Sequence, residues 1–436
     1  MSLFSGNIFS LGTENAFKMG QHILRAEDKL GSVTKLNLGE PDFPLPIHIK
    51  DEIKRQLEAN NTHYCDPKGL LTLREAVAEN ISQTRKLDVD PERVVVFPGA
   101  KPSIGFVQQA YCSKGDEVIY PSPGFPIYES FIKYVGATPV PMHLHESNGF
   151  VWCPEKFASL ITPNTKIIYL NSPSNPTGTV LSYEQIEEIA EIICRLCSKE
   201  VRVYSDEIYE KILFDDNEHV SIASMPGLED RTIISSGFSK TYAWTGGRIG
   251  YAVFPTIKEA EVFKNLNINY FSCVSPYNQE AARVAINSHL SEKYVSEMVS
   301  IFQKRRDIIW DIFAGLNGVS CNKPGGAFYL FPNIGDVCED LGILDYYEHM
   351  FKVDRSCMSP SGLFQNFALY HHGVAVLDRS SFGKLGSDNE HFIRVSIAAD
   401  LQVLEEGIDK LSNAMVDKKG MNIFLDERPD CNLGPE

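Results

Sequence analysis

One stretch of the chain carries most of the information about its fold: SGFSKTYAWTGGR, from Ser236 to Arg248. It follows the β-branched run 232–234, which is typical of a buried strand. Lys240 stands among Ser, Thr and Gly residues, and a desolvated lysine amine can form a Schiff base with a carbonyl group. The hydroxyls, the glycine N–H groups and Arg248 suit a phosphate. The stretch therefore predicts a site that captures an aldehyde and a phosphate together.

Apolar and β-branched runs alternate with helical patterns through the middle of the chain. The expected strands are Arg93–Phe97, Asp116–Tyr120, Thr165–Leu170, Val201–Ser205, Thr232–Ser235 and Arg248–Phe254. This alternation predicts an α/β fold with a doubly wound, mostly parallel sheet. Asn175, Asp206 and Lys240 each follow a different strand. Ligands of such sheets bind outside the carboxyl ends of the strands, so we expect these three side chains to meet at one edge.

Four further windows accompany the lysine segment. They are Leu38–Phe43 (LGEPDF), Asn171–Gly178 (NSPSNPTG), Ser205–Tyr209 (SDEIY) and Phe392–Ser396 (FIRVS). An aldehyde that reacts with amines and a phosphate that a protein can bind are both present in pyridoxal 5′-phosphate (PLP). With these windows in this order, the chain resembles the class I/II aminotransferases, which are fold-type I PLP enzymes, and within them the bacterial-type aspartate aminotransferases.

The resemblance implies a division into a large and a small domain. Residues 1–45 are expected to pack with the small domain, 46–290 to form the large PLP-binding domain, and 291–416 to form a smaller α+β domain. Residues 417–436 are polar, contain Gly and Pro, and are interpreted as a tail. The region around 334–372 fits the family pattern poorly and is expected to be a divergent insertion.

The resemblance also implies catalytic roles. Lys240 would hold PLP as a Schiff base and later move the proton of the substrate α-carbon. Asp206 would pair with the pyridine nitrogen, where a carboxylate favours the charged ring. Tyr209 and Asn175 would donate hydrogen bonds to the phenolic oxygen of the cofactor.

Phosphate binding needs cations and donors. Arg248 is the strongest candidate, because a guanidinium can grip a phosphate with two bonds. The backbone at Ala100 and Lys101 begins a helical stretch, where N–H groups suit an anion. Ser239 and Ser236 are both candidate hydroxyl donors; the family often places a serine at the position of Gly237, so which serine acts stays open.

Two aromatic residues complete the implied cofactor site. Phe125 matches the aromatic side chain that stacks on the cofactor ring. Tyr64 matches a tyrosine that reaches the phosphate of the neighbouring subunit. This match implies a homodimer with shared active sites.

The substrate contacts follow from the same resemblance. Arg394 would clamp the α-carboxylate with two hydrogen bonds, assisted by the Gly39 backbone and Asn175. Two interpretations of Lys101 stay open. It either holds the distal carboxylate of aspartate or glutamate, or it only adds positive field near the phosphate.

These residues predict a PLP-dependent aminotransferase that moves an amino group from an amino acid to a 2-oxo acid. The alternative is a PLP-dependent lyase of the same fold, such as a C–S lyase, an aminocyclopropane carboxylate synthase type or a decarboxylase. A regulator with a PLP-type domain is a third reading, although the sequence before Gly39 has no room for the DNA-binding domain that such proteins carry. Fold alone does not separate these activities.

The composition of the chain limits the binding partners and the cellular compartment that we expect for it. The chain has 436 residues, a net charge of −16 and a pI near 5.2, which argue against nucleic-acid binding. No apolar run is long enough for a membrane span, and the start lacks the features of a signal peptide. The ten cysteines form no disulfide framework, which favours the cytoplasm. Cys194 and Cys197 are expected on the buried face of a helix over Ser182–Lys199. The histidine pairs 143/145 and 371/372 are interpreted as surface or packing residues. No metal site is therefore predicted.

Overall fold

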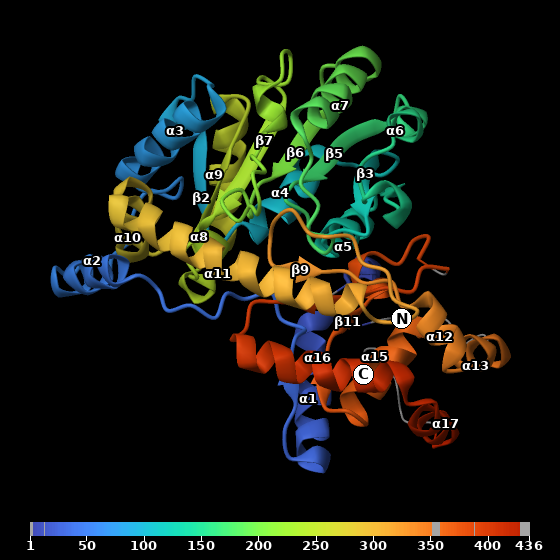
Figure 1. Ribbon diagram of the computed structural model, residues 1–436. Coiled ribbons are helices and arrows are strands. Elements are labelled where there is room, and N and C mark those ends of the chain that lie inside the picture. The colour runs from blue at the N-terminus through green and yellow to red at the C-terminus, as the bar shows by residue number, and fades with distance from the viewer. Residues whose placement is uncertain (1–2, 13, 351–357, 388, 428–436) are drawn as a thin grey trace.

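The computed structural model describes residues 3–12, 14–350, 358–387 and 389–427. Its large sheet has seven strands in the order β2-β8-β7-β6-β5-β3-β4. These are β2 (Val94–Phe97), β3 (Glu117–Ser122), β4 (Thr138–His143), β5 (Thr165–Asn171), β6 (Arg202–Asp206), β7 (Thr232–Gly237) and β8 (Gly250–Val253). All neighbours are parallel except β8, which runs antiparallel to β2 and β7. The predicted mostly parallel sheet is confirmed (Figure 1).

Each of the six expected strands overlaps a strand of the sheet, but β4 was not predicted. Its sequence is TPVPMH, and prolines cannot donate to a ladder. The strand can contain them because it lies at the edge of the sheet, where it pairs only with β3. Tertiary position therefore overrides the local signal here.

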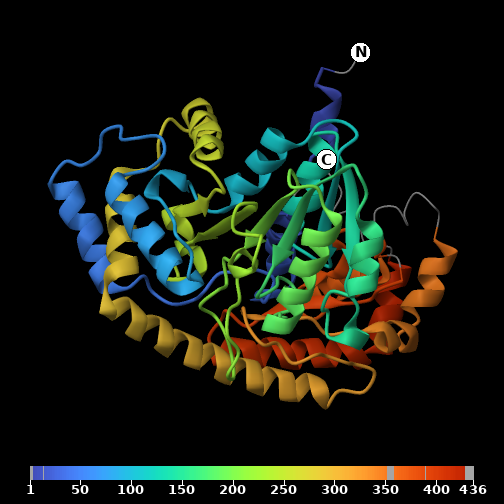
Figure 2. The ribbon, with the colours of Figure 1, turned by 90° about the horizontal axis from the view of Figure 1, so that it is seen from above.

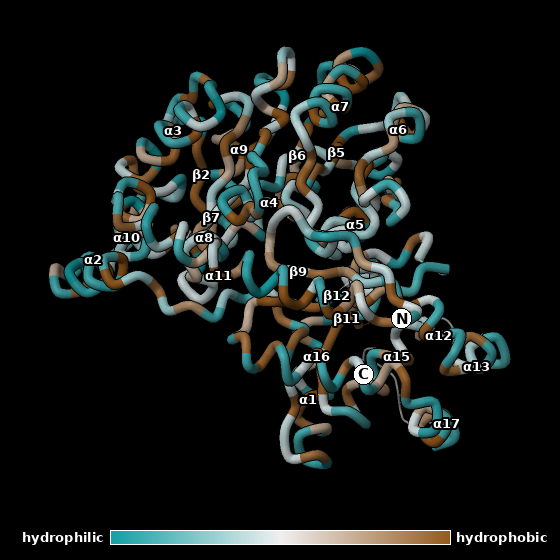
Figure 3. The backbone as a smooth tube through the Cα atoms, viewed as in Figure 1, coloured by the Kyte–Doolittle hydropathy of each residue, from teal (hydrophilic) through white to brown (hydrophobic). Residues whose placement is uncertain are grey.

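Helices cover both faces of the sheet. Within β2, Val94 and Val96 belong to one apolar cluster and Val95 and Phe97 to another, as the period of two in a strand requires. The first cluster includes residues of α2 (Ile47–Glu58), α3 (Leu71–Arg85) and α10 (Pro276–Asn287). The second includes residues of α4 (Lys101–Tyr111), α5 (Ile127–Tyr134) and α9 (Ile257–Tyr270). The sheet is therefore doubly wound, with its apolar strands between helices (Figure 3).

Helix α7 (Tyr183–Leu196) begins with the expected capping box between Ser182 and Gln185. The side chains of Ile186, Ile189 and Ile193 are buried, with α6 (Pro154–Leu160) beside them. The placement of Cys194 on this buried face was wrong, because Cys194 is exposed and its thiol lies against the carbonyl of Pro226 at 3.7 Å. Cys197 caps the helix and is half-buried.

A second, smaller group of elements packs against the edge of the sheet part. It contains a three-stranded antiparallel sheet of β11 (Leu377–Asp378), β12 (Ile393–Ser396) and β9 (Tyr329–Leu330). Its helices are α11 (His289–Ala314), α12 (Gly335–Asp340), α13 (Ile343–His349), α15 (Pro360–Tyr370) and α16 (Leu401–Val416). Helix α11 contacts both α10 and α16, and it runs along one edge of the molecule past both parts (Figure 2).

The N-terminal segment joins this smaller group. β1 (Thr34–Lys35) pairs in parallel with β10 (Val374–Ala375), and α1 (Asn15–Leu30) packs on α15. In Figure 1 the blue N-terminal helix lies among the orange and red elements. The domain boundaries near residues 45 and 290 stay predictions.

The region around 334–372 contributes to the core. Phe364 and Phe367 of α15 are fully buried in the same apolar cluster as residues of α11 and α16. Residues 351–357 of this region lie outside the described residues. Whether the region is an insertion relative to the family stays a prediction.

The interpretation of residues from 417 onward as a polar tail was wrong for their first part. Lys418–Asp426 form helix α17, and Asp417 caps it by accepting the N–H of Gly420 at 2.8 Å. Met421 and Phe424 are buried in the core of the small part. The polar residues of this helix face outward, so a simple count of polar residues hid its amphipathic pattern. Residues 428–436 lie outside the described residues.

Two other sequence observations concern membranes and metals. None of the described helices combines the length and the apolar character needed to cross a bilayer.

The rings of His371 and His372 lie 3.8 and 3.3 Å from the carboxylate of Asp417. Their interpretation as surface or packing residues rather than metal ligands stays a prediction.

Candidate active site

The carboxyl edge of the large sheet brings distant segments together. Asp206 is the last residue of β6, and Lys240 lies on the short helix α8 (Phe238–Thr241) directly after β7. Asn171 ends β5 in register with Asp206. Because β2, β3, β5, β6 and β7 are parallel, the loops that follow them open at the same edge. β8 runs in the opposite direction, so its beginning, next to Arg248, reaches this edge as well.

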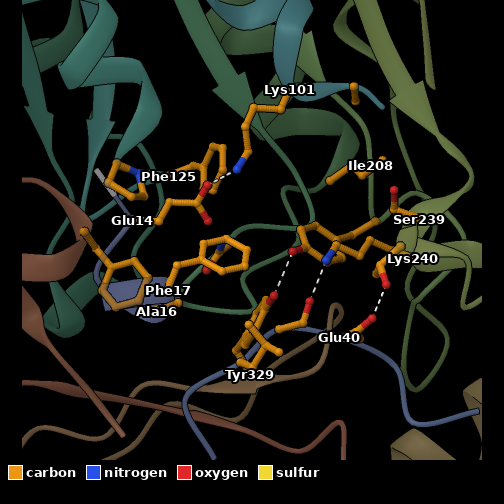
Figure 4. A pocket seen from close by; sticks show the side chains of 18 of the residues that line it. Glu14, Ala16, Phe17, Glu40, Lys101, Phe125, Ile208, Ser239, Lys240 and Tyr329 are labelled. Carbon is orange, nitrogen blue, oxygen red and sulfur yellow. Dashed lines mark hydrogen bonds and ion pairs between the residues drawn. The ribbon is translucent and has the colours of Figure 1, made fainter. Parts of the chain in front are cut away.

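A cavity of about 480 Å³ opens at this edge. Its lining includes these predicted site residues: Gly39, Ala100, Lys101, Phe125, Asn175, Asp206, Tyr209, Ser239, Lys240, Arg248 and Arg394. Segments from the N-terminus, the large sheet and the small part all contribute to the lining (Figure 4). Of the predicted set, Ser236 and Tyr64 do not line this cavity.

Lys240 is half-buried, and its amine lies inside the cavity. It donates a hydrogen bond to the carbonyl oxygen of Gly39 at 2.5 Å and lies 5.8 Å from the centre of the Phe328 ring. Burial, followed by the positive charge of Arg394, lowers the pKa of Lys240 from 10.5 to about 8. A larger share of this lysine is therefore neutral and nucleophilic near physiological pH than of an exposed lysine.

Asp206 provides a buried carboxylate. The hydroxyl of Tyr128 donates to it at 2.6 Å, and the backbone N–H of Ile208 lies at 3.4 Å. Burial raises the pKa of Asp206 to about 6, and none of the described groups that shift it is a cation. A buried carboxylate without a cation favours a positively charged ligand, such as a protonated ring nitrogen.

Asn171 connects the end of β5 to the end of β6 and to the loop that carries Asn175. The Asn171 amide donates to the backbone oxygen of Asp206 at 2.9 Å, and its side-chain oxygen accepts the N–H of Asn175 at 3.0 Å. Asn171 thus positions both predicted residues. Sequence reasoning assigned it no role, although it begins the window that was compared with the family.

Tyr329, on β9, was also missed. Its hydroxyl lies 2.8 Å from that of Tyr209, and a Cβ atom on Gly39 would collide with it. Gly39 is therefore required for steric reasons, because the backbone passes directly over the Tyr329 ring. Tyr209 is buried at this junction between the sheet and the small part.

Arg394 lies on β12 with its guanidinium buried. It donates to Asn175 Oδ1 at 2.9 Å and to the carbonyl oxygen of Asn37 at 2.6 Å. Its centre lies 4.3 Å from the Tyr329 ring and 4.9 Å from the Phe382 ring. Its Nε is buried and has no hydrogen-bond partner among the described residues. A buried unpaired donor is costly, so this arginine is suited to an incoming carboxylate.

Another part of the cavity lining, formed by Arg248 and the start of α4, offers N–H groups that can donate hydrogen bonds to an anion. Arg248 has a positive φ of 53° and donates to the carbonyl oxygens of Thr245 and Pro98 at 2.9 and 3.1 Å. A Cβ atom on Gly99 would collide with its guanidinium, so Gly99 allows the close approach. Ala100 is the N-cap of α4, where backbone N–H groups point outward.

The two candidate serines lie in different environments. Ser239 lines the cavity. Ser236 is 1% exposed, and its hydroxyl lies 3.1 Å from the Glu210 carboxylate and 3.3 Å from the backbone oxygen of Glu207, either of which can accept its hydrogen. The structure therefore does not bring Ser236 to the cavity, because β7 turns its side chain toward a buried cluster that includes Arg85.

Lys101 lies at the mouth of the cavity, where sequence reasoning missed its neighbours. Its ammonium forms an ion pair with Glu14 and lies 5.6 and 5.7 Å from the ring centres of Phe17 and Phe125. Glu14 and Phe17 come from the start of α1, and no motif pointed to them. Tyr64 is 87% exposed and lies outside the cavity of its own chain.

Comparisons with known proteins identify the family. The family model for aminotransferase class I and II matches residues 31–411. The chain belongs to the class I and II aminotransferases. It is 35% identical to an aspartate aminotransferase from Pyrococcus abyssi over 89% of this chain and 92% of that protein, and 33% identical to aromatic-amino-acid aminotransferase 2 from Thermococcus litoralis over the same shares. A solved aspartate aminotransferase from Rhizobium meliloti has a TM-score of 0.84 and 30% identity, covering 95% of this chain and 99% of that one.

This class I and II aminotransferase is a PLP-dependent transaminase with the fold-type I architecture. The residues of its cavity fit the cofactor: a buried amine at Lys240, a buried carboxylate at Asp206 without a cation, and anion donors at Arg248 and Ser239. PLP supplies the electron sink that carries charge away from the substrate α-carbon.

Proposed function

We propose that this aminotransferase transfers the amino group of aspartate or glutamate to a 2-oxo acid, with each predicted residue acting at this cavity. Arg394 binds the α-carboxylate through its free Nε and a terminal nitrogen. Lys240 moves the α-proton once its amine is free, and its lowered pKa suits a base near neutral pH. The meeting of a buried arginine, a half-buried lysine and a buried carboxylate in one cavity is the observation that carries the proposal.

The remaining residues orient the cofactor. Asp206 keeps a positive charge on the ring nitrogen, and Asn175 and Tyr209 donate toward the ring oxygen. Phe125 covers the ring face, while Arg248, Ser239 and the N–H groups at Ala100 and Lys101 bind the phosphate. The exposed side chain of Tyr64 suits a contact with a second subunit, so we include a homodimer with shared sites.

Lys101 supports the acidic substrate class. It lies at the mouth of the cavity, on the cavity wall that also carries Phe125, and can neutralise a distal carboxylate once that carboxylate replaces Glu14 as its partner. The names of the relatives from Pyrococcus abyssi and Rhizobium meliloti agree with this class. The described cysteines are free and the chain is acidic, which suits a reducing cytoplasm and argues against nucleic-acid partners.

A single-turnover experiment tests the reaction type. Holoenzyme mixed with an amino acid and no 2-oxo acid should release one equivalent of 2-oxo acid per site and then stop. Continued release of ammonia or of an unsaturated product would indicate a lyase instead. Lys101→Ala should raise KM for aspartate and glutamate far more than for alanine, and equal losses would remove the proposed substrate role of Lys101.

A further inference from the structure

The part of the cavity beside Lys101, proposed above for the distal carboxylate of the substrate and called its distal end, contains a cation that is already paired. The Lys101 ammonium lies 5.6 Å from the ring centre of Phe17 and 5.7 Å from that of Phe125, and it forms an ion pair with Glu14 (Figure 4). The Lys101 side chain is 41% exposed and that of Glu14 is 16% exposed. The subsite therefore presents two aromatic faces and a neutralised ion pair rather than a free ammonium.

Glu14 is oriented toward the cavity rather than toward its own helix. It is the N-cap of α1, a position whose side chain commonly accepts a backbone N–H of the first turn. Its carboxylate makes no such capping hydrogen bond and reaches Lys101 on α4 instead. The next residue, Asn15, donates to Ser381 Oγ at 2.9 Å and so attaches the start of α1 to the small part.

We propose that Glu14 is a specificity-determining residue that acts as an internal counter-ion of Lys101. Substrates with uncharged side chains bind with the ion pair intact. A substrate with a distal carboxylate must displace Glu14 from Lys101. This inference rests on the proposed function of the cavity. A second carboxylate that approaches Lys101 meets the negative charge of Glu14, and like charges in a partly buried site repel. The pair is partly exposed, so displacement is possible and acidic substrates are handicapped rather than excluded.

Two ligands of equal carbon length isolate this effect. Succinate and butyrate both carry one carboxylate for Arg394, and only succinate carries a second one for the distal end. In Glu14→Gln holoenzyme, calorimetry should show that the preference for succinate over butyrate rises by about tenfold relative to wild type. The kcat/KM ratio of aspartate to alanine should rise in parallel through KM.

Two control variants make the test specific. Glu40→Gln removes a carboxylate from the same cavity lining, but Glu40 is hydrogen-bonded to Thr245 and not paired with Lys101. It should change the preference for succinate by less than Glu14→Gln does. In a Lys101→Met background, Glu14→Gln should leave the preference nearly unchanged.

The outcomes separate the two proposals. An unchanged preference in Glu14→Gln, or an equal rise in Glu40→Gln, overturns the counter-ion role even if both ligands still bind. Failure of Arg394→Met to weaken either ligand overturns the proposed substrate site instead. A preference that rises only while Lys101 is present supports both.

Discussion

At the residue scale, the burial of Lys240 determines when its amine can react. Its pKa is lowered to about 8, first by burial and then by Arg394. In apoprotein, the rate of PLP capture should therefore rise with pH through a midpoint near 8 rather than near 10.5. Rapid-mixing absorbance across this range measures the midpoint. Arg394→Met should move it upward, and a wild-type midpoint near 10 would contradict the burial argument.

The lowered pKa of Lys240 also makes the folding stability of the apoprotein depend on pH. The unfolded chain holds a proton on this lysine up to pH 10.5, whereas the folded chain loses it near 8. Below pH 8 the buried cation costs free energy of folding. Between these two values the unfolded state binds more protons, so the contribution of Lys240 to apoprotein stability improves as pH rises.

Asp206 allows a test of charge at constant shape. Asp206→Asn keeps the side-chain size but removes the negative charge that we propose to face the ring nitrogen. We expect the single-turnover rate to fall on the order of 10²–10³-fold. Tyr128→Phe is the control, because it removes the hydrogen bond at 2.6 Å and keeps the charge. A loss below about tenfold in Asp206→Asn would argue against the contact with the ring nitrogen.

At the element scale, the close passage of the segment after β1 over β9 makes Gly39 sensitive. A methyl group on Gly39 would collide with the hydroxyl of Tyr329, which also bonds Tyr209. Gly39→Ala should raise KM for amino-acid substrates while circular dichroism stays native. Adding Tyr329→Phe removes the nearest atom and should recover part of the loss; no recovery would show that the collision is not the cause.

Helix α17 is a second element whose importance is testable. Met421 is fully buried, whereas Ile423 on the same helix is 44% exposed. Met421→Ala should lower the free energy of unfolding by about 2–5 kcal/mol, seen as a lower urea midpoint. Ile423→Ala should change it by no more than about 0.5 kcal/mol. Equal effects would mean that α17 does not belong to the core of the small part.

At the scale of the whole molecule, the proposed contact of Tyr64 with a second subunit predicts that one chain does not form a complete site. Lys240→Ala and Tyr64→Ala homodimers should each have low activity. In mixed dimers, one site lacks both side chains and the other has both. Random subunit exchange should therefore restore roughly a quarter of wild-type activity. No recovery, after exchange is demonstrated by tagged subunits, would place the whole site within one chain.

The order of residues along the chain determined much of this protein by itself. A lysine after a β-branched run, with Asn175 and Asp206 after other strands, was enough to predict the sheet and the edge where they meet, because parallel strands bring their carboxyl ends together. The motif around Arg394 predicted the carboxylate site. These signals lie within short stretches of the sequence, and the order of the strands in the sheet brings them to one edge.

Only the tertiary structure decided which further side chains, beyond those assigned a role from sequence, face the cavity. Glu14, Tyr329 and Asn171 reach the site through contacts between distant elements, which no spacing along the chain records. Ser236 and Ser239 illustrate the same limit, since both stand near the lysine in sequence. Ser236 belongs to β7 and points into a buried cluster, whereas Ser239 lies on α8 and lines the cavity. The end of a strand, not distance along the chain, separates a core hydroxyl from one that lines the cavity.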